Sequence, residues 1–260
     1  MNLTDDIALA QALADAAGAA IRPFFRAPTE HEAKADASPV TEADRAAELA
    51  MRDLLAKARP DDGIIGEEYG TERADASRVW VLDPIDGTVS FMAGRPTFGT
   101  LIALLVDGWP VLGVIDQCIS GERWVGAMGE GTTFNGKPVQ TRHAAELSQM
   151  TLASTGPQYF DEHDADHFMQ LAAKTAHKRM VWGGDCYSYG LLASGYIDLV
   201  VEAGLKLHDY AALVPIVEGA GGMMCDWNGE PLSADSEGHV IACGDPARMD
   251  DVLEALACGH

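Results

Sequence analysis

Apolar residues recur at helical spacing near the start of the chain. They follow one face of residues 4–25, which predicts a first helix. A second helix is predicted for residues 41–58, because Thr41 can cap it and Asp44 lies in its first turn. The polar residues 30–38 show no period, so we interpret them as a mobile loop between the two helices.

The pattern then changes to short β-like runs separated by turn signals. Asp107-Gly108 is typical of a hairpin turn between two of these runs. No helical pattern lies between the runs, so we expect one sheet of sequential strands. The predicted strands cover residues 64–65, 79–82, 99–106, 111–117 and 123–127.

The second half alternates strand and helix patterns, which is typical of layered α/β packing. Strands are predicted for residues 150–154, 178–181, 197–201, 223–226 and 240–242, and helices for 162–176, 185–193, 208–220 and 246–257. Pro215 should kink the third of these helices. We expect a single α/β unit over residues 1–260, with an N-terminal half of about 1–145 and a C-terminal half of about 146–260.

The charge of the chain disfavours some partners. The 260 residues include 40 acidic and 18 basic ones, for a net charge of −22. Such a surface repels nucleic acid and anionic membranes, so neither is an expected partner. A phosphate substrate would also be repelled unless bound cations supplied local positive charge. The charge could instead serve only to keep the protein soluble.

Cysteine usage and hydropathy indicate a cytoplasmic protein. The five cysteines include no Cys-x-x-Cys pair, which favours reduced thiols over a disulfide framework or a zinc site. No basic segment followed by an apolar stretch opens the chain, so no signal peptide is expected. The longest apolar runs, such as residues 100–106, are too short to span a bilayer.

Acidic residues lie where predicted strands end. An apolar run delivers Asp83, and Pro84 should prevent the strand from continuing as a central ladder member. After the resulting turn, Asp86 can face the same volume as Asp83, and the Ile85 carbonyl is exposed beside them. Two carboxylates this close, with no Lys or Arg nearby, tolerate each other best around a divalent cation.

The oxygen-only ligands indicate which ion and which chemistry to expect. Carboxylates and carbonyls suit Mg²⁺, which takes its remaining contacts from water and substrate phosphate. Two such ions about 3.5–4 Å apart could activate a water and stabilise a leaving oxygen. Gly87 permits close approach, and Thr88 supplies a hydroxyl at a possible helix start, where a phosphate is favoured.

Simpler interpretations of the same residues remain open. The run Asp-Pro-Ile-Asp-Gly-Thr could be only a turn, because Asp, Pro and Gly dominate turns. Glu67, which follows a glycine, could face solvent, and Asp209 could serve only at a helix N-terminus.

Four segments together carry a family resemblance. They are Gly66-Glu67-Glu68, Trp80-Val81-Leu82-Asp83-Pro84-Ile85-Asp86-Gly87-Thr88, His208-Asp209-Tyr210-Ala211-Ala212 and Glu218-Gly219-Ala220-Gly221-Gly222. In this order they resemble the inositol monophosphatase family of Mg²⁺-dependent, Li⁺-sensitive phosphatases, and the resemblance covers nearly the whole chain. It implies the layered α/β/α/β/α sandwich of the inositol monophosphatase and fructose-1,6-bisphosphatase type, usually as a homodimer. It also implies two to three Mg²⁺ ions per site, possible use of Mn²⁺, and inhibition by Li⁺.

The resemblance further implies a role for each of these residues. One ion would bind to Glu67, Asp83 and the Ile85 carbonyl, and a second to Asp83, Asp86 and Asp209. Glu67 and Thr88 would position the attacking water, and the Gly87 and Thr88 amides would bind the phosphate. Asp44 would help to bind a third, weaker ion. His208 replaces the tryptophan that commonly precedes the aspartate in this family, a departure that should not disturb the ligand itself. The eight histidines do not cluster at metal-ligand spacing, so none is assigned to metal.

Other stretches resemble the histidinol-phosphate phosphatase branch of the family, namely residues 113–117, 121–124, 182–187 and 193–202. By this resemblance, Asp185 and Glu202 contact the organic part of the substrate, beside Asp86 and Asp209. Acidic groups suit the ammonium and imidazole of histidinol phosphate, whereas inositol needs only hydroxyl partners. Asp185 could instead cap a helix, Glu202 could be a solvated strand end, and Arg123 and Trp124 could be ordinary strand residues.

The leading hypothesis is therefore Mg²⁺-dependent hydrolysis of a small phosphate monoester, L-histidinol phosphate in histidine biosynthesis, by in-line attack of a metal-activated water. One alternative is an inositol-1-phosphate or broad-specificity phosphatase on the same scaffold. An alternative of another class is a non-catalytic binding protein that has kept the fold.

Overall fold

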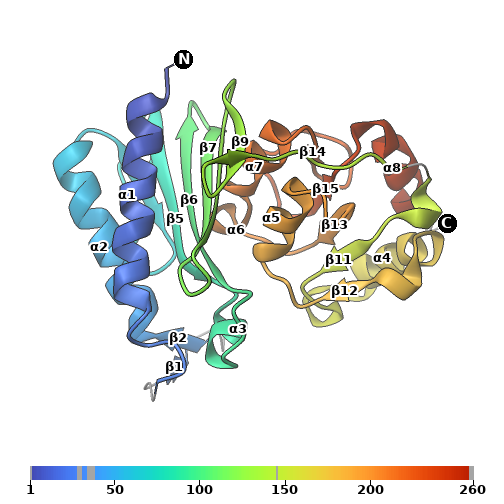
Figure 1. Cartoon of the computed structure of the whole chain (residues 1–260), viewed down its shortest axis with the longest axis horizontal. Helices are drawn as coiled ribbons and strands as arrows, with labels where there is room; N and C mark the ends of the chain where they lie inside the picture. Colours follow the sequence, from blue (N-terminus) through green and yellow to red (C-terminus); the bar gives the residue numbers. More distant parts are fainter. Residues whose placement is uncertain (1, 28–30, 34–38, 145, 258–260) are drawn as a thin grey trace.

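The computed structural model describes residues 2–27, 31–33, 39–144 and 146–257. Two large sheets alternate with helices across the long axis of the molecule (Figure 1). The order is α1 and α2, the first sheet, α5 to α7, the second sheet, and then α4 and α8. The expected α/β/α/β/α sandwich is confirmed.

The first sheet has the strand order β10-β9-β8-β7-β6-β5-β3-β4. Its strands are β3 (Gly63–Gly66), β4 (Gly70–Glu72), β5 (Arg78–Asp86), β6 (Gly99–Val106), β7 (Trp109–Gln117), β8 (Glu122–Ala127), β9 (Gly131–Phe134) and β10 (Lys137–Pro138). From β5 to β10, sequential strands pair antiparallel, whereas β3 runs parallel to β5. The expectation of no helix between the strands is wrong at one place, because α3 (Thr88–Met92) separates β5 from β6.

Helices α1 (Thr4–Ile21) and α2 (Glu42–Ala58) cover the outer face of this sheet and bury an apolar core against it. The first helix ends four residues earlier than predicted, since Pro23 has no N–H to extend the helical ladder. The prediction of a loop over residues 30–38 is wrong for β1 (His31–Ala33), which pairs with β2 (Pro39–Thr41). Residues 30 and 34–38 lie outside the described residues.

The second sheet has the order β12-β11-β13-β15-β14 and mixes parallel and antiparallel pairs. Its strands are β11 (Leu152–Ser154), β12 (Val181–Trp182), β13 (Leu199–Glu202), β14 (Met223–Cys225) and β15 (Val240–Cys243). Helices α4 (Glu162–Lys174) and α8 (Met249–Ala257) pack on its outer face. The strand predicted for residues 178–181 is displaced, because 177–179 form a 3₁₀ turn before β12.

The middle layer contains α5 (Tyr187–Ala193), α6 (Leu207–Tyr210) and α7 (Leu213–Gly219). The single helix predicted for residues 208–220 is split between α6 and α7, because Pro215 cannot donate a hydrogen bond to the Ala211 carbonyl. The backbone of α7 lies directly on the first sheet: a Cβ at Gly113 would be 1.9 Å from the Ala212 oxygen, and one at Gly126 would be 2.4 Å from the Pro215 oxygen. This close packing holds the start of α6 over the end of β5.

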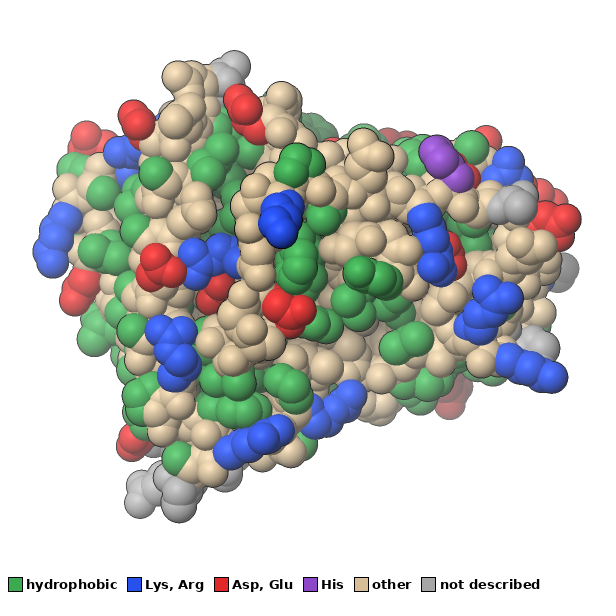
Figure 2. All heavy atoms as spheres, in the orientation of Figure 1, with side chains coloured by type: hydrophobic (Ala, Val, Ile, Leu, Met, Phe, Trp, Pro, Cys, Tyr) green, Lys and Arg blue, Asp and Glu red, His purple; other side chains and the backbone are tan. Residues whose placement is uncertain are grey.

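Acidic and basic side chains are interspersed on the face of the molecule that Figure 2 shows, so the net charge of −22 does not gather there. Among the described helices, none is both long and apolar enough to cross a membrane.

Candidate metal centre

Two neighbouring parallel strands bring the first pair of acids together. Gly66 of β3 is in register with Leu82 of β5, so Glu67 and Asp83 follow at the same edge of the sheet. The Glu67 N–H donates to the Leu82 carbonyl at 3.2 Å, which continues the pairing for one more residue. Both side chains therefore leave the sheet side by side.

A β-bulge places Asp86 beside Asp83. Asp83 pairs with Leu101 and Asp86 with Gly99, so β5 has one extra residue over this stretch. The expectation that Pro84 stops the strand is wrong: β5 continues to Asp86, because the bulge tolerates a residue without an N–H. The alternative that this run is only a turn is also wrong, since residues 83–86 belong to β5.

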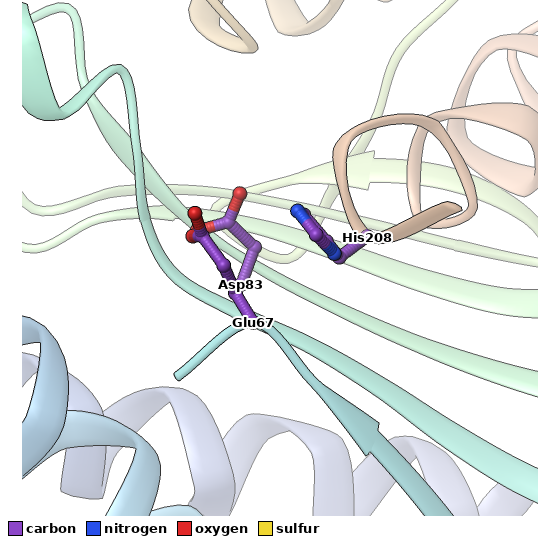
Figure 3. A group of neighbouring side chains, drawn as sticks. All are labelled: Glu67, Asp83 and His208. Carbon is purple, nitrogen blue, oxygen red and sulfur yellow. The ribbon is translucent and has the colours of Figure 1, made fainter. Parts of the chain in front are cut away.

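The structure brings two groups of possible metal ligands together. Asp83, Asp86 and Asp209 each offer an oxygen, and these three atoms lie within 4.8 Å of one another. Glu67, Asp83 and His208 form a second group by the same measure. Figure 3 shows the two carboxylates of this second group converging, with one ring nitrogen of His208 on the side that faces them.

Asp209 takes part in helix capping as well. At the third position of α6, its Oδ2 accepts the backbone N–H of Lys206 at 2.6 Å, as the capping interpretation expected. Its Oδ1 lies 3.5 Å from Nε2 of His208. The cap thus fixes the carboxylate while one oxygen stays on the side of the other acids.

Like charges and burial make this group of acids unfavourable without a cation. Burial, followed by the carboxylates of Glu67, Asp86 and Asp209, raises the pKa of Asp83 well above its usual value. Burial, followed by Asp185 and Asp209, does the same to the pKa of Asp86. No described Lys or Arg forms an ion pair with Asp83 or Asp86.

The donor set fits a hard divalent cation. Asp83 is 1 % exposed, and its Oδ1 has no hydrogen-bond partner among the described residues. A buried oxygen left without a partner is costly, and an ion on it would remove that cost. The predicted carboxylates Asp83, Asp86 and Asp209 therefore lie close enough together to share an ion.

The Ile85 carbonyl and Thr88 lie beside these acids. The Thr88 hydroxyl donates to the Ile85 carbonyl at 3.1 Å, which leaves that oxygen a second lone pair for an ion. Gly87 has φ of 80°, and a Cβ on it would lie 2.7 Å from Cγ of Asp185. This conformation and this close contact favour glycine. Gly87 and Thr88 line an open cavity of about 420 Å³.

Two acidic residues of helix α2 lie near the metal centre and the loop that carries Glu67. Asp44 lies in its first turn, is 1 % exposed, and is close enough to contribute to the raised pKa of Asp83. One turn later, the buried Glu48 accepts the backbone N–H groups of Glu68 and Tyr69 and thereby holds the loop that carries Glu67. Our sequence reasoning missed Glu48, although a charged residue on the apolar stripe of α2 was a usable signal.

Asp185 lies beside Gly87 and lines the same cavity. Its backbone has φ of 45°, unusual for a residue other than glycine, and its Oδ2 accepts the Ser90 hydroxyl at 2.6 Å. It makes no side-chain cap to α5, so the capping alternative is wrong for this residue. Burial raises the pKa of Asp185.

Glu202 lies at the end of β13 and is 6 % exposed, so the interpretation as a solvated strand end is wrong. The Thr155 N–H and the Tyr189 hydroxyl donate to its carboxylate at 2.8 Å and 3.2 Å. Burial nevertheless raises the pKa of Glu202 to about 7. No described Lys or Arg lies within ion-pair distance of Glu202 or Asp185, although the positive charge of Arg95 lowers the pKa of Asp185 against the effect of burial.

Arg123 and Trp124 have structural roles. Arg123 pairs with Asp116 and Asp15 on the outer side of the first sheet. Trp124 is buried, and its indole N–H donates to the Ser194 hydroxyl at 2.9 Å. Both are therefore ordinary strand residues, as the alternative interpretation of the sequence expected.

His208 is the member of the site that sequence spacing did not indicate. The structure corrects the expectation that no histidine lies at a possible metal group, because α6 carries His208 to Glu67 and Asp83. Its position next to Asp209 in the chain was the only available signal.

Comparison with known proteins gives a consistent result. The family model of the inositol monophosphatase family matches residues 2–258. The chain is 45 % identical to the bifunctional phosphatase IMPL2 of Arabidopsis thaliana over 96 % of this chain and 74 % of that protein. It is 39 % identical to a histidinol-phosphatase of Chlorobaculum parvum over 92 % and 93 % of the two chains. A solved structure described as an inositol monophosphatase from Zymomonas mobilis is 54 % identical, covers 98 % and 99 % of the two chains, and has a TM-score of 0.91.

Proposed function

Because the chain belongs to the inositol monophosphatase family, we propose that it is a Mg²⁺-dependent phosphomonoester hydrolase that prefers L-histidinol phosphate. The observation that carries the proposal is that two acids, Asp185 and Glu202, line the same cavity as Gly87 and Thr88. A substrate with phosphate at one end and positive charge at the other complements such a cavity.

The metal end of the cavity would bind and hydrolyse the phosphate. Glu67, Asp83 and the Ile85 carbonyl would hold one ion, Asp83, Asp86 and Asp209 a second, and Asp44 would help a third, weaker one. When bound, these ions supply acidity to a water and neutralise charge on the phosphoryl oxygens.

The residues of this chain would then position the reacting groups. Glu67 and Thr88 would orient the attacking water, and Glu67 would take its proton. The Gly87 and Thr88 amides would hold the phosphate in line. The new bond would form between the water oxygen and phosphorus as the ester P–O bond breaks. The departing alkoxide would take a proton from solvent and Glu67 would return its proton to solvent, so that the products are the alcohol and inorganic phosphate.

The other end would select the alcohol. Asp185 and Glu202, with Asp86 and Asp209 nearer the metals, would bind the ammonium and imidazole of histidinol. The relatives named histidinol-phosphatase support this choice. We place the reaction in histidine biosynthesis.

Inositol 1-phosphate is the second candidate, which the description of the Zymomonas mobilis structure favours. The Ser90, Thr155 and Tyr189 hydroxyls beside the two acids show that this part of the cavity also hydrogen-bonds to hydroxyl groups. A broad-specificity phosphatase would accept both esters.

A substrate panel tests the proposal. Phosphate release is measured with Mg²⁺ from L-histidinol phosphate, inositol 1-phosphate and a nucleoside monophosphate. We expect kcat/KM for histidinol phosphate to exceed that for the other esters by at least about tenfold. Equal or better turnover of inositol 1-phosphate would reject the substrate assignment, and no turnover of any ester would favour a non-catalytic binding protein.

The same proposal includes a cytoplasmic homodimer that uses Mg²⁺, that can also use Mn²⁺, and that Li⁺ inhibits. Four described cysteines are free and buried, which supports a reducing compartment. Light scattering on the purified protein measures the dimer, and a Li⁺ titration of turnover measures the inhibition.

A further inference from the structure

His208 gives one of the two metal positions a nitrogen donor. A ring nitrogen of His208 and one oxygen each from Glu67 and Asp83 lie within 4.8 Å of one another. Two ligands of one ion are at most about 4 Å apart, since metal–nitrogen and metal–oxygen bonds are about 2.0–2.2 Å long. The three atoms therefore need to close by less than about 1 Å to share an ion.

The surroundings leave this nitrogen available. The imidazole side chain is 13 % exposed and lines the same cavity as Glu67. Its Nε2 lies 3.5 Å from Oδ1 of Asp209, which is too long for a good hydrogen bond. On the other side, the buried Oδ1 of Asp83 has no hydrogen-bond partner among the described residues. Figure 3 shows a ring nitrogen of His208 facing the carboxylates of Glu67 and Asp83, so one ion could bind to the imidazole and to these carboxylates together.

The group without His208 differs in its chemistry. Asp83, Asp86 and Asp209 offer oxygen only, which suits Mg²⁺. Imidazole is a softer donor that suits Mn²⁺ less than Co²⁺ or Zn²⁺, and affinity for mixed nitrogen and oxygen sites rises from Mn²⁺ to the later divalent metals. The two positions share Asp83 yet are not chemically equivalent.

We propose that His208 ligates the ion held by Glu67 and Asp83, so that this position prefers transition metals while its neighbour keeps a preference for Mg²⁺. This inference rests on the metal centre of the proposed function, and it adds a ligand and a metal preference to it. The predicted consequence is a mixed-metal centre when Mg²⁺ and a transition metal are both present.

Pulsed electron paramagnetic resonance tests the ligand without any measurement of turnover. The metal-free protein is loaded with one and then two equivalents of Mn²⁺, and electron spin echo modulation is recorded. A directly bound imidazole couples its ¹⁴N nucleus to Mn²⁺, and ¹⁵N-labelled histidine changes the coupling frequencies. We expect this signal in the wild type, its loss in His208→Gln, and its retention in His239→Gln, whose ring pairs with Asp164 on another part of the surface.

Competition between metals measures the preference. Co²⁺ or Zn²⁺ is titrated against Mg²⁺. The affinity for the transition metal divided by the affinity for Mg²⁺ should be at least about tenfold lower in His208→Gln and in His208→Phe than in the wild type. Thermal melting confirms that both variants are folded. Bound Mn²⁺ with no ¹⁴N signal at either loading in the wild type would overturn the inference and leave the phosphatase proposal intact. A protein that binds no Mn²⁺ but hydrolyses esters with Mg²⁺ would overturn it as well, whereas absence of both binding and turnover would reject the proposed function itself.

Discussion

The two ends of the cavity use the same kind of side chain under different conditions. At the metal end, Asp83 and Asp86 are crowded by other carboxylates, and both pKa values are raised. At the other end, Asp185 and Glu202 each accept hydrogen bonds from hydroxyl groups. Burial and then the neighbouring carboxylates raise the pKa of Asp83, and a cation would relieve this repulsion. The hydroxyl partners of Asp185 and Glu202 only partly offset burial, because the pKa values of these two acids are raised as well. Under the proposed function, the metal end would determine the reaction and the other end would determine the substrate.

The largest expected effect comes from breaking the metal end. Asp83→Asn should lower Mg²⁺-dependent turnover by about 10³-fold or more, since Asp83 belongs to both ligand groups. The metal-free variant should melt about 2–4 °C above the wild type, because the substitution removes a buried, repelled carboxylate. Phosphate release and thermal melting in a chelator measure the two effects.

Asp53→Asn is the matched control for that substitution. Asp53 lies exposed on the outer face of α2, so neither turnover nor melting should change. Full activity of Asp83→Asn would refute the metal assignment. A metal-free variant that melts well below the wild type would contradict the repulsion described here.

Gly87→Ala tests the boundary between the two ends. The new methyl group would lie 2.7 Å from Cγ of Asp185, on a backbone held at φ of 80°. We expect kcat/KM to fall about a hundredfold, because the collision displaces both the phosphate amides and Asp185 (about 3 kcal/mol). Steady-state kinetics with two esters measures the loss.

Gly108→Ala separates the collision from the backbone strain. Gly108 has φ of 84°, and nothing lies within 4 Å of a Cβ built there. It should therefore lose some stability and no activity. If both alanine variants lose activity equally, the contact between Gly87 and Asp185 has no part in the chemistry.

The metal end could be predicted from the sequence far better than the wall formed by Asp185 and Glu202. Asp83 and Asp86 sit in one short segment, and the acid–proline–acid order already places them together. The continuation of β5 through Pro84 could not be predicted, because a bulge depends on pairing with Leu101 and Gly99 from a distant strand. Layer order followed from the alternation of strands and helices, and element ends were less accurate at residues such as Pro23 and Pro215.

His208 and Glu48 were missed for the same physical reason. Each reaches the site through packing between layers: α6 lies over β5, and α2 lies under the loop after β3. Spacing along the chain reports only local neighbours. For Glu202, the sequence allowed a solvated strand end, whereas the structure buries the side chain. This burial comes from the second sheet and from the neighbours Thr155 and Tyr189.

Glu202→Gln tests the comparison at the end of the cavity proposed to bind the organic part of the substrate. The substitution keeps the shape and removes the charge, so KM for histidinol phosphate should rise about thirtyfold, or about 2 kcal/mol. KM for inositol 1-phosphate should change less than about twofold, because a neutral sugar loses no ionic partner. Glu254→Gln, on the exposed face of α8, is the control and should change neither value.

The smallest expected effect is the pH dependence of binding at that wall. Burial raises the pKa of Glu202 to about 7, so in the free enzyme this group is mostly protonated at pH 6 and mostly charged at pH 8. The charged fraction then rises about tenfold, and KM for a cationic ester should fall by up to that factor between the two values. The same raised pKa means that the folded protein binds more protons than the unfolded chain between about pH 4.5 and 7, so the contribution of Glu202 to stability decreases as pH rises through that range.

Glu202→Gln again provides the reference, because the imidazole of the substrate also titrates near this range and acts in the opposite direction. Subtracting the pH profile of the variant leaves the part that belongs to Glu202. Initial rates at several substrate concentrations, from pH 5.5 to 8.5, give the two profiles. Parallel profiles for wild type and variant would mean that Glu202 does not sense the positive charge of the substrate, and the distinction between a metal end and a cation-selecting end would then rest on Asp185 alone.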